Sequence, residues 1–149
     1  MTLSLVWSPE FETGIDIIDS QHRQLFDYLE QVEEAIQAED PSRVEEVARG
    51  LVHYAISHNT FEESLMAKAG YPMLEAHSKI HESFKERAHS YLKQIDDGAD
   101  PMRVAREMRV YLGLWLINHI KREDRHYVPY VKKSLDRGFA ARMISKLFG

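Results

Sequence analysis

The sequence of 149 residues contains no cysteine. This absence excludes disulfides, thiolate metal sites, iron–sulfur clusters and thioether-linked haem. The sequence also has no excess of basic charge, because 19 Lys and Arg stand against 24 Asp and Glu for a formal net charge of −5. A nucleic-acid partner is therefore not expected. The length is sufficient for one hydrophobic core, and we expect residues 1–149 to form a single domain.

Long hydrophobic runs are missing as well. The uncharged stretch Val110–Ile120 is far shorter than the roughly 20 apolar residues that cross a bilayer. The N-terminal residues Met-Thr-Leu-Ser do not place a basic flank before an apolar run, which is the pattern of a signal peptide. We therefore expect no membrane partner and a cytoplasmic location.

The alternation of apolar and polar residues that is typical of strands is also absent. Apolar residues recur instead at spacings of three and four, which predicts helices. Asp40-Pro41 and Asp100-Pro101 are typical helix starts, and Gly70, Gly98 and Gly138 are typical stops. Because the connections are short, consecutive helices should lie antiparallel. The expected fold is all-α, an up-down-up-down antiparallel four-helix bundle over residues 20–135 with helices over 20–38, 41–69, 72–95 and 101–135, an N-terminal extended arm over 1–19, and a tail over 138–149 with a short fifth helix over 139–148.

The 8 histidines are unusual in this composition. Residues four apart on a helix lie about 40° from each other and share a face. On this basis His53 and His89 point outward. Five other histidines and one glutamate lie on the apolar faces of the four predicted helices: His22, His58, Glu62, His77, His81 and His119.

A lone inward histidine is usually a core residue that has found a hydrogen-bond partner. Five together favour a shared ligand, because an unpartnered buried polar group costs about 1 to 3 kcal/mol. Imidazole and carboxylate together bind iron, copper or zinc. The sequence therefore predicts a metal site inside the bundle.

Two carboxylates follow His119 on the fourth helix. In a regular helix Glu123 lies about 40° from His119 and Asp124 about 140°. Regular geometry therefore favours Glu123, but it leaves later apolar residues in water. A π-bulge near Asp124, to which Pro129 would contribute by removing a backbone donor, corrects this pattern. We expect Asp124 to be the ligand, with an inward set of Asp124, Tyr127, Val128, Val131 and Leu135.

The resulting constellation resembles the hemerythrin family, and its single-domain bacterial members in particular. The similarity covers about residues 7–131. The seven ligand positions occur in order as His22, His58-x-x-x-Glu62, His77-x-x-x-His81 and His119-x-x-x-x-Asp124. The residues around them also match the family: Trp7, Ile18-Asp19-Ser20-Gln21 before His22, Glu63, Leu65-Met66, Gly70-Tyr71-Pro72, Trp115-Leu-Ile-Asn before His119, and Ile120 after it.

The resemblance implies reversible O₂ binding without turnover. In that family two irons (Fe²⁺/Fe³⁺) share two carboxylates and a bridging oxo or hydroxo group, and one iron keeps an open position for O₂. Carried over to this chain, the bridges are Glu62 and Asp124. His77, His81 and His119 complete the coordination of one iron. His22 and His58 bind the other. Trp115, Leu116 and Ile120 resemble the apolar side chains that line the oxygen pocket in that family. They would also fit as ordinary residues of the hydrophobic core.

Asn59 departs from the family, which usually has phenylalanine directly after the histidine of the second helix. Our hypothesis is that an amide at this position admits water or donates a hydrogen bond, and so speeds conversion of the oxygenated protein to the inactive diferric form. The alternative is that Asn59 points away from the pocket, since it lies about 100° from His58 on a helix.

Three other interpretations compete with this one. A ferritin-like di-iron oxidase would use Glu86-x-x-His89 and Glu123-x-x-His126, but Glu86 lies about 180° from His77 on a helix and so faces outward. The hemerythrin-like scaffold itself could serve an enzyme reacting with O₂, peroxide or nitric oxide, or an oxygen sensor. The tail over 139–148 could pack over a bundle end, or dock an oxidase or a second copy, through Phe139, Met143, Ile144, Leu147 and Phe148.

Overall fold

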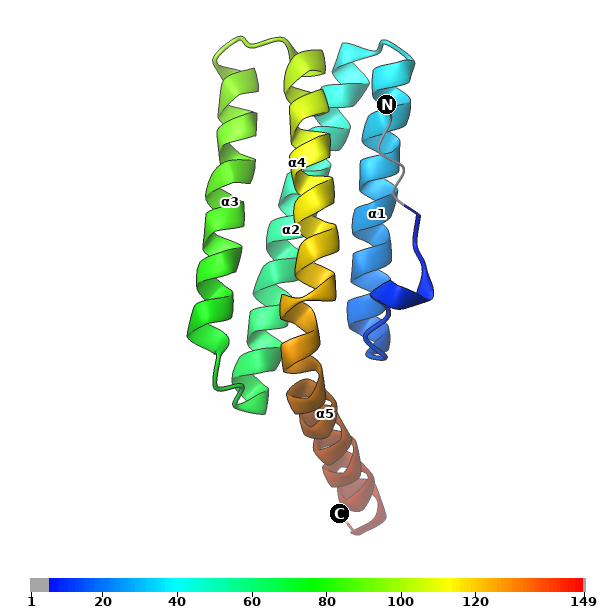
Figure 1. Cartoon of the computed structure of the whole chain (residues 1–149). Helices are drawn as coiled ribbons and strands as arrows, with labels where there is room; N and C mark the ends of the chain where they lie inside the picture. The colour runs from blue at the N-terminus through cyan, green and yellow to red at the C-terminus, as the bar shows by residue number, and fades with distance from the viewer. Residues whose placement is uncertain (1–5, 149) are drawn as a thin grey trace.

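The computed structural model describes the backbone of residues 6–148 and the side chains of residues 6–138. A 3₁₀ turn, η1, is followed by five helices, and no strand occurs within residues 6–148. The elements are η1 (Pro9–Phe11), α1 (Asp16–Gln37), α2 (Pro41–Ala69), α3 (Leu74–Asp96), α4 (Pro101–Lys121) and α5 (Glu123–Phe148). The prediction of an all-α antiparallel bundle is confirmed, because α1 to α4 alternate in direction (Figure 1).

The predicted caps of α2 and α4 are present. The Asp40 and Asp100 side chains accept hydrogen bonds from the backbone N–H groups of Arg43 and Met102. Gly70 ends α2 in the left-handed conformation, with φ of 67°, which costs a residue with a side chain more than it costs glycine. These short, well-capped connections hold neighbouring helices antiparallel.

The arm before α1 differs from the predicted extended segment of residues 1–19 in two ways, because it contains the 3₁₀ turn η1 and because α1 already begins at Asp16. The buried Asp19 carboxylate accepts hydrogen bonds from the backbone N–H groups of Thr13 and Gly14 and from the Thr13 hydroxyl. These bonds attach the arm to the first turn of the helix. Farther back, the rings of Trp7 and Phe11 pack against Phe26 of α1.

The fourth predicted helix is divided. It stops at Lys121, Arg122 leaves helical geometry with φ of −108° and ψ of −71°, and α5 starts at Glu123. The expected π-bulge near Asp124 is therefore wrong in kind, since no π-helical segment occurs in residues 6–148. Pro129 lies inside α5, away from this break. The physical reason for a break is the burial of Tyr127 and Val131, each 1 % exposed, which a regular helix would turn outward.

The predicted separate short helix over 139–148 is also wrong, because α5 runs through Gly138 to Phe148. Figure 1 shows α5 leaving the lower end of the bundle. Leu135 was expected to be inward but is 38 % exposed, since this part of α5 has left the bundle. The tail side chains Phe139, Met143, Ile144, Leu147 and Phe148 lie outside the described side chains.

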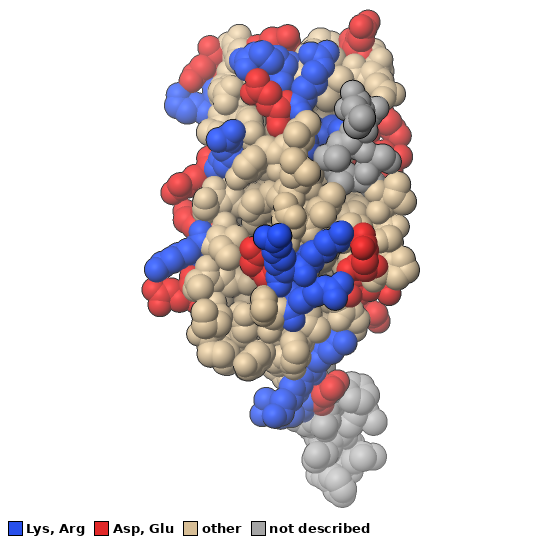
Figure 2. Space-filling model, viewed as in Figure 1, with Lys and Arg blue, Asp and Glu red and all other residues tan. Residues whose placement is uncertain are grey.

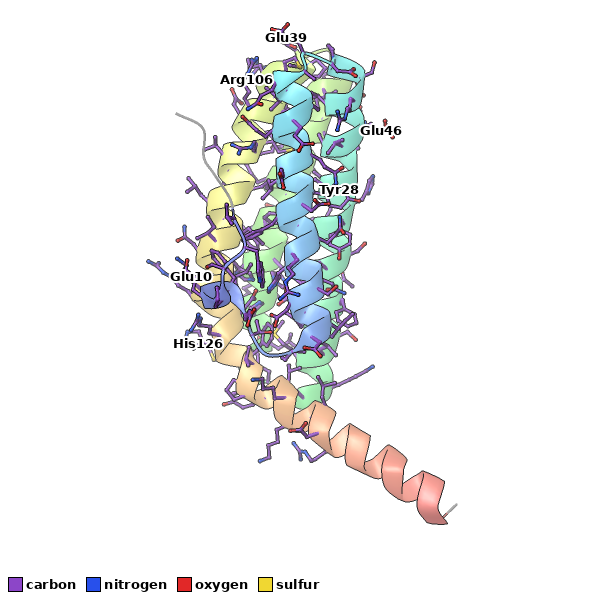
Figure 3. The ribbon with its side chains drawn as sticks, turned by 90° about the vertical axis from the view of Figure 1, so that its right-hand side faces the viewer. Glu10, Tyr28, Glu39, Glu46, Arg106 and His126 are labelled. Atoms are coloured by element: carbon purple, nitrogen blue, oxygen red, sulfur yellow. The ribbon has the colours of Figure 1, made fainter. Side chains whose placement is uncertain are left out.

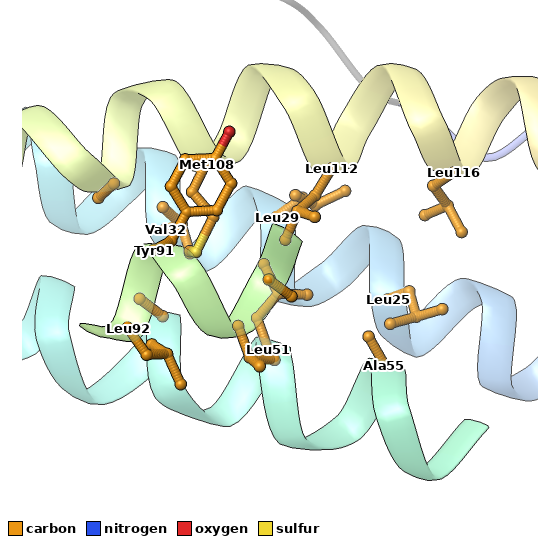
Figure 4. Packing of buried hydrophobic residues seen from close by; sticks show 14 of the residues in the cluster. Leu25, Leu29, Val32, Leu51, Ala55, Tyr91, Leu92, Met108, Leu112 and Leu116 are labelled. Carbon is orange, nitrogen blue, oxygen red and sulfur yellow. The ribbon is translucent and has the colours of Figure 1, made fainter. Parts of the chain in front are cut away.

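Two apolar clusters fill the bundle. The larger one occupies the upper part of all four bundle helices and contains Leu25, Leu29, Leu51, Met108 and Leu112, whose side chains point into the space between the helices (Figure 4). The smaller one lies where α5 begins, and it contains Ile15, Ile18, Met66, Tyr71, Tyr127 and Val131.

Figure 2 shows acidic and basic side chains interspersed over one face of the molecule. Within the described residues, no helix is both long enough and apolar enough to cross a bilayer.

Candidate metal centre

The up-down topology brings the predicted ligands to one end of the bundle. They stand near the start of α1 and α3, near the end of α2 and α4, and at the start of α5. Antiparallel neighbours place all of these segments at the same level (Figure 1). The seven side chains are each no more than 3 % exposed: His22, His58, Glu62, His77, His81, His119 and Asp124.

These residues form two groups, in each of which the candidate ligand atoms lie within 4.8 Å of one another. The first group contains His77, His81, His119 and Asp124. The second contains His22, His58 and Glu62. The structure thus brings together residues from all five helices. Each group offers imidazole nitrogens and one carboxylate, a donor set that suits iron, copper or zinc.

Asp124 connects the two groups through its two oxygen atoms. Its Oδ1 lies 2.9 Å from His119 Nε2 and 3.3 Å from His77 Nε2. Its Oδ2 lies 3.3 Å from His22 Nε2, which belongs to the other group. Since a carboxylate can bind two cations through different oxygens, this orientation is that of a bridging ligand. The break at Arg122 produces it, because a regular helix would turn Asp124 away from His119.

Glu62 lies on the other side of the same space. Its Oε1 contacts His58 Nε2 closely and lies 3.8 Å from His22 Nε2. Neither oxygen of Glu62, nor either oxygen of Asp124, has a hydrogen-bond partner, although both side chains are fully enclosed. The ring nitrogens of His22 also lack one. Enclosed acceptors without donors cost about 1 to 3 kcal/mol each, so the residues fit a pair of cations that would satisfy them.

Polar side chains lie beside the outer Nδ1 atoms of three imidazoles, and one of them is hydrogen-bonded. Gln21 Oε1 lies 2.6 Å from His58 Nδ1, and Glu63 Oε2 lies 3.4 Å from His81 Nδ1. Glu123, the rejected ligand candidate, has Oε2 at 3.7 Å from His119 Nδ1. The Gln21 acceptor places the ring proton of His58 on Nδ1 and so presents Nε2 for metal binding, whereas Nδ1 of His81 and Nδ1 of His119 have no hydrogen-bond partner. The sequence did not predict these roles, although Gln21, Glu63 and Glu123 each stand next to a candidate ligand.

Charge at the centre follows from these contacts. Burial and the nearby Asp124 carboxylate both oppose ionisation of Glu62, but His58 and His22 outweigh them and hold the pKa of Glu62 well below its ordinary value. Burial also opposes ionisation of Asp124, yet His119, His22 and His77 keep its pKa well below its ordinary value. Both acids are therefore anionic at neutral pH, as cation ligands must be.

The imidazoles respond differently from one another. Burial lowers the pKa of His22, but Asp124 and Glu62 outweigh this effect and raise it to about 9. Burial lowers the pKa of His81 to about 4, with His119 and His77 adding to the effect. His81 is therefore neutral at pH 7, the form in which imidazole binds metals.

The remaining buried group beside the centre is the hydroxyl of Tyr127, which the sequence reading placed inward without a role. It is enclosed and has no hydrogen-bond partner. Burial, together with the carboxylates of Glu62 and Asp124, raises the pKa of Tyr127 well above its ordinary value. The ring lies 5.7 Å from that of His77.

An apolar cavity lies beside Trp115, and none of the seven candidate ligands lines it. The Trp115 ring stacks on His119 with centroids 4.3 Å apart, and Trp115, Leu116 and Asn59 line the cavity together with residues of the larger apolar cluster. Asn59 is 6 % exposed and lines this cavity as well as a second one between α2 and α3. Ile120 is buried in the core but does not line this cavity.

The residues of the ferritin-like alternative do not converge. Glu86 and His89 are exposed on the outside of α3, and His126 is exposed on α5 (Figure 3). Glu123 is half-buried and turns to the outer side of His119. His53 is exposed, as is His89. The prediction that these two histidines point outward is therefore confirmed.

Comparisons with known proteins agree with this geometry. Residues 13–131 match the family model described as the hemerythrin HHE cation binding domain. A bacteriohemerythrin of Pseudomonas aeruginosa is 36 % identical, over 97 % of this chain and 98 % of that protein. The bacteriohemerythrin of Clostridium acetobutylicum is 34 % identical, over 83 % and 98 %.

Similarity also extends to an animal protein and to a solved structure. The myohemerythrin of Riftia pachyptila is 32 % identical, over 82 % of this chain and 89 % of that protein. A crystal structure of wild-type hemerythrin superposes with a TM-score of 0.76 at 26 % identity, covering 87 % of this chain and 98 % of that one. The family match, the relatives and the shared fold lead to one conclusion: the chain belongs to the hemerythrin family.

Proposed function

We propose that this protein binds molecular oxygen reversibly at a di-iron centre. Membership of the hemerythrin family and the two adjacent clusters of imidazole and carboxylate support this function. The single observation that carries it is the orientation of Asp124, whose two oxygens face histidines of different clusters. Such a carboxylate is suited to hold two metal ions side by side.

The proposed ligand set divides unequally between the two irons. Asp124 and Glu62 would bridge them, as the unpartnered oxygens of both side chains suggest. His77, His81 and His119 would complete the coordination of one iron. His22 and His58 would bind the other. The second iron would then lack one protein ligand, and the bound irons supply the electrons and the open coordination position that oxygen binding requires.

The protein's own residues would orient the ligands and exclude water. Gln21 fixes the ring of His58, and Glu63 faces that of His81. Trp115 covers the ring of His119. No acidic or basic side chain lines the apolar cavity beside Trp115. A cavity that offers no proton donor stronger than an amide favours release of oxygen unchanged.

We further propose that the protein is an oxygen carrier or store rather than an enzyme. Proteins of this family are generally carriers, and the apolar cavity supports the same role. An oxygen sensor would use the same centre, and an oxidase would differ by forming product in each cycle.

The experiment is an absorption spectrum of anaerobically reduced, iron-loaded protein, taken under argon, in air and again under vacuum. We expect a visible band that appears in air, disappears under vacuum and returns over repeated cycles with no net oxygen consumption. Oxygen uptake that continues in every cycle, or a band that never reverses, would contradict the carrier function.

Two narrower expectations form part of the proposal. The α5 tail after Gly138 would dock an oxidase or a second copy, which truncation after Gly138 tests through oligomeric state and thermal stability. A cytoplasmic location is tested by cell fractionation.

A further inference from the structure

Asn59 stands between two cavities. It lies on α2 directly after His58, and its residue is 6 % exposed. The inner cavity is the apolar one beside Trp115. The outer cavity lies between α2 and α3, and its lining includes Asn59, Glu63, His81 and Lys85. Asn59 is the one residue that lines both.

The two cavities differ in character and in size. The outer one, of about 60 Å³, is lined by charged and polar side chains apart from Ile56, and a space of this size holds several water molecules. The inner one, of about 10 Å³, is lined by hydrocarbon and aromatic side chains apart from Asn59. A cavity of that size and polarity has room for about one small molecule and stays dry without a polar partner.

Other sides of the inner cavity are closed by packed side chains. Trp115 packs on Phe84, with ring centroids 4.2 Å apart, and this contact fills the space between α3 and α4. Leu29, Leu51 and Leu112, each no more than 2 % exposed, close the cavity toward the larger apolar cluster. The amide of Asn59 is the polar part of the wall, and it can exchange hydrogen bonds with water on the outer side.

We propose that Asn59 is the gate through which water and small polar ligands pass from the α2–α3 cavity into the pocket beside the metal centre. A rotation of this one side chain would join the two cavities without moving a helix. This inference rests on the proposed function, because it concerns access to the same pocket. It predicts that the size and polarity of residue 59 set the rate of access and leave the metal ligands unchanged.

The test uses the diferric, iron-loaded protein and azide as a small probe of iron access. Association rate constants are measured by stopped-flow absorption for the wild-type protein, Asn59→Ala, Asn59→Leu and Asn118→Ala. The last is a matched control, since Asn118 also neighbours a candidate ligand histidine but is exposed on α4. Alanine is a good helix former, so the open variant should keep α2 intact. Iron content and far-UV circular dichroism confirm comparable folding.

We expect Asn59→Ala to raise the azide association rate about tenfold and Asn59→Leu to lower it about tenfold, with Asn118→Ala unchanged; a tenfold change equals about 1.4 kcal/mol in the barrier. A second measurement does not depend on kinetics. Crystal structures of the two Asn59 variants should show ordered water in the inner cavity of Asn59→Ala and none in that of Asn59→Leu.

Equal rates in all four proteins, or rates that shift in the same direction in both Asn59 variants, would overturn the gate. A dry inner cavity in Asn59→Ala would also overturn it. Failure of the proposed function looks different, because the wild-type protein would then bind no iron pair or show no reversible band in air.

Discussion

We propose that Asp124 determines whether the centre holds one metal or two. Its two oxygens face His119 and His22, which stand on different helices and belong to different clusters. Glu123, one residue earlier, contacts only the outer nitrogen of His119 and is half-buried. The two neighbours therefore have different roles that can be separated by substitutions of the same kind.

We predict that Asp124→Asn lowers the iron content from about two per chain to one or none, because an amide is a poor bridge between cations. The matched change Glu123→Gln should weaken iron binding by no more than about 10 to 100-fold, the usual effect of an outer partner, and should retain both irons at saturating ferrous iron. Iron analysis after gel filtration gives the answer. Loss of iron in Glu123→Gln but not in Asp124→Asn would reverse the assignment.

Asn59→Phe tests the effect of the buried amide on the lifetime of the oxygenated protein. A phenyl ring would exclude water from the boundary between the two cavities that Asn59 lines. We expect conversion to the diferric form to slow about tenfold, equal to about 1.4 kcal/mol in the barrier. Absorbance followed in air over time measures the rate. An unchanged or faster conversion would count against a role for the amide.

At this scale, spacing alone was enough to predict which histidines point inward. His58 with Glu62, and His77 with His81, are four residues apart and share a helix face. Spacing could not reveal the contact of Gln21 with His58, because it joins two helices whose relative rotation depends on packing. The same limit applies to Tyr127, whose inward side was predicted but whose position beside the centre was not.

Two glycines near helix ends behave differently because their backbone geometry differs. Gly70 ends α2 with φ of 67°. Gly138, which the sequence pattern marked as a stop, lies inside α5 and does not have a positive φ. A Cβ added at either glycine meets no atom within 4 Å, so backbone conformation alone decides the outcome.

We predict that Gly70→Ala destabilises the protein by about 1 to 2 kcal/mol, the cost of the left-handed conformation for a residue with a Cβ. Gly138→Ala should instead increase helix content and leave stability equal or up to about 1 kcal/mol higher. Urea unfolding and far-UV circular dichroism measure both. A loss of stability in Gly138→Ala similar to that in Gly70→Ala would show that Gly138 ends a helix.

Helix ends were predictable where a cap side chain and a proline coincide, as at Asp40-Pro41 and Asp100-Pro101. The break at Arg122 was predicted only as a distortion near Asp124, and in the wrong form, because no local residue dictates where the helix stops. It follows from long-range demands, namely that Asp124 reach the centre and that Tyr127 and Val131 be buried. The course of α5 beyond Gly138 was missed for a related reason: an arginine followed by glycine resembles a helix end when no tertiary contact is considered.

The whole molecule places a polar layer between two apolar clusters. The larger cluster lies above the layer and the smaller one, built around Ile18, Met66 and Tyr127, lies below it. Two ionised carboxylates in that layer are shielded from water, so they depend on neighbouring positive charge. In the metal-free protein a protonated His22 supplies part of it, since its pKa is raised to about 9.

This electrostatic balance predicts that iron affinity increases with pH. Iron binding must displace the proton on His22, whose folded pKa lies above its ordinary value, so protons compete with iron at every pH below about 9. The apparent ferrous affinity should fall about tenfold for each unit by which the pH drops, because this one proton competes with iron. Mild acid should therefore release the iron.

Ferrous binding isotherms at pH 6, 7 and 8 measure this slope. Iron content that stays constant down to strongly acidic pH would contradict the account.

We propose that all five helices meet around two metal ions joined by Asp124. The most direct test is a crystal structure of the iron-loaded protein with anomalous data collected at the iron edge. We predict two iron peaks within about 4 Å of each other, with one oxygen of Asp124 on each. A single peak, or two peaks that Asp124 does not join, would contradict the account.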